Sequence, residues 1–176
     1  MNIFENNPKQ LIIKEIPQLR RYARSLCPQV EDAEDLVQAT LERALQKFHL
    51  WRSGSNMKAW LHTIMHNLRV NAVKKEAKNH SETRQGVDLD QIPDPTVAIA
   101  LSPTLNDLET AMTRLSEKHR EVLLLVGLEQ FSYDEAARIL GISNGTVMSR
   151  LHRARRQLHN MLYQTESSNV TLRRIK

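Results

Sequence analysis

Residues 132–147 read SYDEAARILGISNGTV, and this stretch decides the fold of the C-terminal half of the chain. Ser132 and Glu135, three residues apart, have the spacing of a capping box, which predicts that a helix starts there. Gly141 suits the left-handed residue that ends such a helix. Ser143 can cap a following helix, so the sequence predicts two helices joined by a tight turn.

The small and apolar residues of the same stretch have the spacing of a helix-turn-helix. Ala137 lets the two helices approach, Gly141 makes the turn, and Val147 fixes the second helix on the first. Beyond Val147 the apolar positions continue at helical spacing through Leu151 to Leu158. The outward face of this second helix then carries Thr146, Ser149, Arg150, His152, Arg153 and Arg156.

The positive charge of the chain is gathered in two patches. The formal net charge is +5, with 25 Lys and Arg against 20 Asp and Glu. Residues 139–160 hold several arginines and no acid, and residues 66–80 form a second basic patch. Arginine can read guanine edges in the major groove, and spare cations can anchor phosphates, so the sequence predicts DNA binding. Two alternatives stay open, a solvated helix face and a helical hairpin used for protein contact.

The N-terminal half also has helical periodicity, from Ile12 to about Lys78. Pro28 ends the first predicted helix, and the acidic run 31–35 lies where the positive N-terminal dipole of the next helix favours carboxylates. A third helix contains Trp60 and Leu68, after a loop at 53–56. We therefore expect a bundle of three or four helices.

Residues 80–104 break the helical pattern and predict a flexible acidic linker. The segment holds several prolines and acids against a single arginine, without helical periodicity. The predicted fold is all-α, with two small helical domains. The boundaries are 1–79 for the N-terminal bundle, 80–104 for the linker, 105–163 for the helix-turn-helix domain and 164–176 for a polar tail.

Composition excludes several other classes of protein. Cys27 is the single cysteine, so neither an internal disulfide nor a cysteine zinc site can form. His62 and His66 have metal-ligand spacing but lack a third ligand, and we expect neither a metal nor a cofactor. No arrangement of nucleophile and base or of paired carboxylates indicates an enzyme. The chain has no apolar stretch of about 18 residues and no signal-peptide pattern, so we expect no membrane insertion and a cytoplasmic protein.

Three motifs in order resemble those of the extracytoplasmic-function (group IV, sigma-70 family) RNA polymerase sigma factors. They are EDLVQAT at 34–40, AWLHTIMHNL at 59–68 and GTVMSRLHRAR at 145–155. The stretches 16–26 and 56–61 resemble the general-stress subgroup of alphaproteobacteria. The resemblance implies an alternative, stress-responsive sigma factor that binds core RNA polymerase, directs initiation at −35 and −10 promoter elements, and is controlled by an anti-sigma factor.

The resemblance also assigns roles to individual residues. The first domain would bind the polymerase β′ clamp helices, and the second the β flap; the positions for the clamp helices are Asp35, Leu36, Gln38, Leu41 and Glu42. Asn67 matches the asparagine that contacts a flipped-out −10 base, and Asn71, one helical turn further on, belongs to the same −10 set. Lys74, Lys75 and Arg69 would then contact phosphates. The full −35 set, with Met148 where many relatives carry a cation, is Thr146, Met148, Ser149, Arg150, His152, Arg153, Arg155 and Arg156.

Two other functions remain open at this point. One is an anti-anti-sigma mimic, a chain of this fold that sequesters an anti-sigma factor without touching DNA. The other is a helix-turn-helix repressor that dimerises through its N-terminal bundle. A palindromic footprint would favour the repressor, whereas asymmetric protection that requires polymerase would favour the sigma factor.

Overall fold

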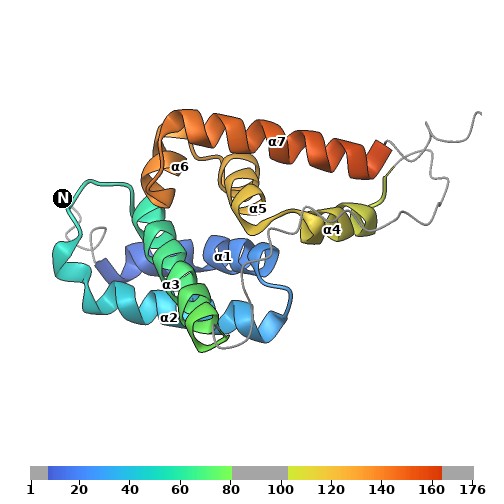
Figure 1. Ribbon diagram of the computed structural model, residues 1–176. Helices are drawn as coiled ribbons and strands as arrows, with labels where there is room; N and C mark the ends of the chain where they lie inside the picture. Colours follow the sequence, from blue (N-terminus) through green and yellow to red (C-terminus); the bar gives the residue numbers. More distant parts are fainter. Residues whose placement is uncertain (1–7, 81–102, 164–176) are drawn as a thin grey trace, which may run out of the picture.

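The computed structural model describes residues 8–80 and 103–163, and all regular structure in these two ranges is helical (Figure 1). The first range forms a first block, and its elements are α1 (Pro8–Leu26), α2 (Val30–Gln46), the 3-10 turn η1 (Phe48–Leu50) and α3 (Met57–His80). The second range forms a second block, and its elements are α4 (Leu105–Arg114), α5 (Glu117–Leu123), the π-helical η2 (Leu124–Leu128), α6 (Tyr133–Leu140) and α7 (Asn144–Tyr163). The predicted all-α fold is confirmed. Most of the predicted linker (81–102) and the predicted tail (164–176) lie outside the described residues.

The first block is held by a core that α1, α2 and α3 share. Leu19 and Tyr22 of α1, Val37 of α2, and Leu61 and Met65 of α3 are all buried. Helix α1 ends just before the predicted Pro28 break, because a residue that precedes proline disfavours the helical conformation. Helix α2 has two acids of the predicted run in its first turn, where they interact favourably with the helix dipole.

The helix-turn-helix forms as the sequence predicts. The Ser132 hydroxyl accepts from the Glu135 amide at 3.2 Å, and the Glu135 carboxylate accepts from the Ser132 amide at 3.0 Å. Gly141 ends α6 in the left-handed conformation, with φ of 62°. The Ser143 hydroxyl caps α7 by accepting from the Thr146 amide at 3.2 Å. Local hydrogen bonds therefore fix both helix ends at the turn.

The second block also contains a distortion that the sequence did not reveal. Helix α5 passes into the π-helical η2, and two residues later Gln130 has a left-handed backbone with φ of 59°. The Gln130 side chain donates to the carbonyl of Gly127 at 2.6 Å, which supports this conformation. The chain therefore turns sharply between α5 and α6, and Glu129 lies at the turn.

The two blocks pack directly against each other. Helix α3 contacts α6, and α1 contacts both α5 and η2 (Figure 1). One cluster of buried apolar residues runs from the first block into the second, and it includes Leu61, Val122 and Phe131. None of the described helices is both long and apolar enough to cross a lipid bilayer.

Candidate nucleic-acid interface

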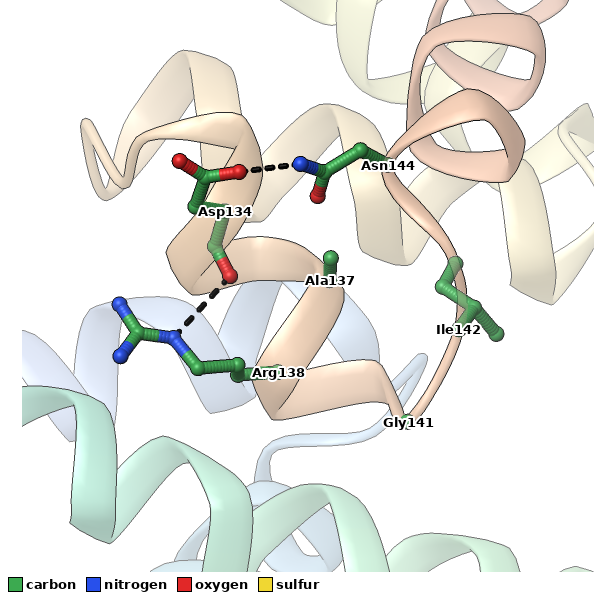
Figure 2. Close-up of a pocket in the computed structure, with 6 residues that line it drawn as sticks. All are labelled: Asp134, Ala137, Arg138, Gly141, Ile142 and Asn144. Atoms are coloured by element: carbon green, nitrogen blue, oxygen red, sulfur yellow. Dashed lines mark hydrogen bonds between the residues drawn. The ribbon is translucent and has the colours of Figure 1, made fainter.

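Contacts at the turn between α6 and α7 set the direction of α7. The Asn144 amide, at the start of α7, donates to a carboxylate oxygen of Asp134, and Arg138 donates its Nε–H to the Asp134 carbonyl at 3.2 Å (Figure 2). Ala137 and Gly141 line the same shallow hollow, where their small size leaves the two helices close together (Figure 2). Helix α7 is thereby held at a fixed angle to α6.

The buried side of α7 consists of small and apolar residues. Val147, Leu151 and Ala154 are buried, and α7 packs against α5 as well as α6. His119 of α5 donates its Nδ1 proton to the amide oxygen of Gln157 at 2.9 Å, since an amide oxygen can only accept. The core face predicted for the second helix of the helix-turn-helix is therefore confirmed.

All the predicted −35 residues lie away from this core. Thr146 and Arg150 are partly exposed, and the others are exposed. In the described part of the chain the four arginines of α7 have neither an ion pair nor a hydrogen bond, so their charge is free to meet a polyanion. The set is Thr146, Met148, Ser149, Arg150, His152, Arg153, Arg155 and Arg156.

These residues are too widely spread around α7 to have one role. At 3.6 residues per turn, they span about 220° of the helix circumference. Ser149, His152, Arg153 and Arg156 lie near the middle of this arc, opposite the core. Arg150 lies at one edge, and Arg155 and Met148 lie at the other. The geometry therefore separates central positions, suited to base edges, from edge positions suited to phosphates.

The predicted −10 residues lie along one exposed face of α3. Asn67, Asn71 and Lys74 are four and three residues apart, and all of them are exposed. The side chain of Lys75 lies outside the described residues. The core face of α3, which includes Leu61 and Met65, lies on the other side of the helix.

A third face of α3, which we call the interface strip, consists of Lys58, His62, His66 and Arg69. Arg69 pairs through Nε with Glu117, and His66 Nδ1 lies 2.6 Å from the Glu121 carboxylate. Arg69 is therefore bound to the second block in this arrangement, and not open to a phosphate. Sequence reasoning counted it within the basic patch. The signal that could have revealed its role is the helical spacing of the strip together with the four-residue spacing of the two glutamates.

Glu129 is the most deeply buried acid of this interface. Its side chain is 0% exposed; Arg21 donates to Oε1 at 2.8 Å, and the Lys58 ammonium lies 3.0 Å from Oε2. Burial by itself raises the pKa of Glu129, but the hydrogen bonds from Arg21 and Lys58 outweigh it, so the pKa lies below its ordinary value. The carboxylate therefore stays charged inside the interface.

His62 packs beside this carboxylate as a neutral ring. Its Nδ1 lies 2.8 Å from the Lys58 carbonyl, which can only accept, so Nδ1 carries the proton. Its Nε2 lies 3.7 Å from Glu129 Oε2 and has no hydrogen-bond partner within the described residues. Burial lowers the pKa of His62 from 6.5 to about 4. The ring is also packed between Tyr22 and Phe131, at 4.8 and 5.0 Å between ring centroids.

The predicted polymerase-binding residues of α2 divide between surface and core. Asp35, Gln38 and Glu42 are exposed, and Gln38 donates to the Glu42 carboxylate at 3.0 Å. Leu36 and Leu41 are half-buried and pack against the core from the two sides of the buried face of α2. Leu45 lies on the same exposed face of α2 as Asp35, Gln38 and Glu42, and it is 53% exposed. It was not among the residues predicted from the sequence. An apolar residue seven positions after Gln38 is the signal that could have found it.

Comparisons with known proteins agree with this division into two blocks. Residues 12–66 match the family model of the Sigma2 domain of PhyR, and residues 105–158 match that of sigma-70 region 4. The chain is 36% identical over 154 residues to the ECF RNA polymerase sigma factor EcfG of Rhodopseudomonas palustris (strain TIE-1). That alignment covers 86% of this chain and 83% of that protein.

Two solved structures are also similar. One is the sigma factor RpoE in complex with the anti-sigma factor NepR from Bartonella quintana, with a TM-score of 0.71 and 35% identity over 90% of this chain and 98% of that chain. The other is the anti-anti-sigma factor PhyR complexed with NepR from Bartonella quintana. Its TM-score is 0.57 at 18% identity, over 88% of this chain and 50% of that chain, which is a likeness of fold alone.

The identity to EcfG extends over more than four fifths of both proteins, and the two family models match one segment in each block, in the same order. The chain therefore belongs to the extracytoplasmic-function family of RNA polymerase sigma factors and is of the general-stress type.

Proposed function

We propose that this chain binds core RNA polymerase and directs it to stress promoters, reading the −35 element with α7 and the −10 element with the exposed face of α3. The observation that carries the proposal is the acid-free arginine surface of α7 on a complete helix-turn-helix, where the arginines have no ion pair with any described residue. The family consists of DNA-binding transcription regulators rather than enzymes, so the chemistry of initiation belongs to the polymerase.

In the −35 complex, the residues at the centre of the α7 arc face the bases. Arg153 is long enough to donate two hydrogen bonds to a guanine, and Ser149 and His152 lie beside it on the same face. Arg150 and Arg155, at the two edges, reach the phosphates that border the groove. Met148 adds apolar contact at an edge position and no charge.

In the −10 complex, the exposed amide face of α3 holds an extruded base. Flipping a base costs a few kcal/mol, so the protein must supply hydrogen bonds that only the flipped base can make. Asn67 supplies an amide that can both donate and accept, and Asn71 lies one turn further along the same face. Lys74 and Lys75 follow where the strand backbone would pass.

The first block corresponds to a domain of residues 1–79 that contacts the β′ clamp helices, and the second to a domain of residues 105–163 that contacts the β flap. The exposed acids Asp35 and Glu42 with Gln38 form a polar stripe on α2, and Leu45 adds apolar area to it. Leu36 and Leu41 support this stripe from the core side. Both polymerase and promoter DNA place the site of action in the cytoplasm.

Control by an anti-sigma factor is part of the same proposal. The similar structure of RpoE was determined with the anti-sigma factor NepR bound to it. A protein that binds both blocks of this chain would cover their polymerase-binding surfaces together. The anti-anti-sigma alternative is less well supported, because the PhyR structure shares only the fold at 18% identity, whereas EcfG is 36% identical. The repressor alternative leaves the likeness of the first block unexplained.

The test is a pull-down of the purified chain with bacterial core RNA polymerase, followed by run-off transcription from a promoter library. We expect stable polymerase binding and initiation from one class of −35/−10 pair. The matched control is a variant with Arg153→Ala and Arg156→Ala, which should bind polymerase normally and lose promoter selection. Absence of polymerase binding by the wild-type chain would exclude the sigma function and leave two alternatives, the anti-anti-sigma mimic and the helix-turn-helix repressor.

A further inference from the structure

The interface between the blocks is polar at its centre. Its ion pairs set cationic or titratable groups of the first block against carboxylates of the second, and Arg120 of the second block donates to the Leu26 carbonyl of the first at 3.3 Å. Glu129 meets Arg21 and Lys58, while Arg69 meets Glu117. At the outer edge of α3, Asn56 donates to the capping-box carboxylate of Glu135 at 2.9 Å. These contacts join elements that are remote in sequence, so they specify one way of closing the chain.

Glu129 is the residue on which this closure converges. It contacts α1 through Arg21 and α3 through Lys58, whose ammonium also donates to the Glu129 carbonyl at 2.6 Å. Lys58 lies over the Phe131 ring as well, 4.8 Å from its centroid. A fully buried carboxylate is tolerated only where cations compensate for its lost hydration, and here both cations come from the other block.

The backbone around Glu129 is distorted in the way that this contact requires. The π-helical segment ends just before it, and Gln130 just after it has a left-handed backbone. A non-glycine residue in that conformation costs about 1–3 kcal/mol and persists only where surrounding contacts fix it. Insertions of π-helix are frequent at functional sites. The irregular segment thus presents Glu129 to the first block and not to solvent.

Closure also brings the two reading faces too close together for one promoter. Elements centred near −35 and −10 are about 25 base pairs apart, which is about 85 Å at about 3.4 Å per pair. Asn67 lies about 17 Å along α3 from the Asn56–Glu135 contact, and Arg153 lies about 14 Å into α7, at about 1.5 Å per residue. With α6, about 12 Å long, between them, the two faces lie within about 50 Å of each other.

We propose that Glu129, together with Lys58 and Arg21, is a latch between the blocks that holds the free chain in a closed form unable to engage both promoter elements at once. This inference rests on the proposed function for its consequence, but the latch itself is a property of the free chain. Binding to polymerase separates the blocks and breaks the latch.

The reactivity of a single cysteine thiol can report whether the two blocks are closed or open. Cys27, the single cysteine, is half-buried in a groove of about 1050 Å³ between the blocks, together with Arg120 and Met112. Its thiol accepts from Arg69 at 3.3 Å, and burial raises its pKa. Opening uncovers the thiol and removes the cause of the raised pKa, so both effects speed its reaction with Ellman's reagent.

The first experiment compares Glu129→Gln with Glu109→Gln in the full chain without polymerase. Glu109 is an exposed glutamate of α4 that lines the same groove as Cys27, so the control removes the same charge from the same block and also measures any direct effect of that charge on the thiol. We expect thiol labelling about tenfold faster in Glu129→Gln, which corresponds to about 1.4 kcal/mol in the opening equilibrium. Its radius of gyration from small-angle X-ray scattering should rise, while Glu109→Gln should match the wild type in both measurements.

A second variant keeps the test valid if Glu129→Gln unfolds the second block. Lys58→Met removes the partner in the first block, and we expect the same rise in labelling, with little further rise in the double variant. Unchanged labelling and unchanged radius in either folded variant would overturn the latch. Both variants should also bind core polymerase more tightly than the wild type. Open variants with unchanged polymerase affinity would overturn the inhibitory role, and neither result depends on promoter selection.

Discussion

At the scale of single residues, the turn of the helix-turn-helix depends on Gly141. Its φ of 62° is left-handed, and a Cβ added there would have no atom within 4 Å, so a side chain would be strained but would not clash. We expect Gly141→Ala to lower the free energy of unfolding by about 1–2 kcal/mol, measured by urea denaturation. Gly127→Ala is the control, since Gly127 does not have a left-handed backbone and a Cβ added there would have no atom within 4 Å. Equal losses in both variants would contradict this account.

His62 makes stability depend on pH. Burial lowers its pKa from 6.5 to about 4, so the unfolded chain binds more protons between these values and stability falls as the pH drops. From pH 7 to pH 5 we expect a loss of about 2 kcal/mol in the free energy of unfolding. The lowered pKa of Glu129 acts in the same direction at more acidic pH, because its contribution is lost as the carboxylate is protonated.

Chemical denaturation across this pH range tests the assignment to His62. The variant His62→Gln should show a flatter dependence than the wild type between pH 7 and pH 5. The exposed His49 provides the comparison, and His49→Gln should keep the wild-type dependence. A wild-type slope that survives in His62→Gln would assign the effect to another group.

At the scale of elements, substitutions at central and edge positions of α7 can distinguish base contacts from phosphate contacts. Arg153 lies near the centre of the exposed arc and Arg155 at its edge. We expect Arg153→Ala to lose about 1–3 kcal/mol of −35 binding and to relax specificity at one position. Arg155→Ala should weaken binding to all sequences alike and reduce the salt slope by about 1. Titrations of the polymerase complex on consensus and single-mismatch promoters measure both, and a uniform loss from Arg153→Ala would reject the central assignment.

The elements also differ in how far the sequence predicts them. The ends of α6 and the start of α7 could be predicted because Ser132, Glu135 and Ser143 act on residues three positions away. The π-helical η2 could not, since Leu124–Leu128 is an ordinary apolar run whose register depends on packing. Likewise, the helical pattern predicts that Asn67 lies on α3, but it could not show that Arg69 is paired and not exposed. The partner of Arg69 is 48 residues away in the sequence.

At the scale of the whole molecule, the sequence predicted two helical units and not their contact. The partners of Glu129 are 71 and 108 residues away, so no local pattern marks them. The interface also reverses the expected role of part of the charge. Arg69, which belongs to the basic patch at 66–80, instead pairs with Glu117 of the second block. Net charge therefore indicates the class of partner, while only the packing shows which cations remain free.

The continuous core predicts that the closed chain unfolds as one unit. Tyr22 and Leu61 of the first block and Phe131 of the second belong to one buried cluster, so neither block can lose its packing without exposing the other. In scanning calorimetry of the wild type we expect a calorimetric enthalpy equal to the van't Hoff enthalpy. With Lys58→Met and Glu129→Gln combined, the ratio should rise toward about 2, the value for two independent units of similar size. Glu109→Gln should keep the wild-type ratio, and a single sharp transition in the double variant would show that apolar packing alone couples the blocks.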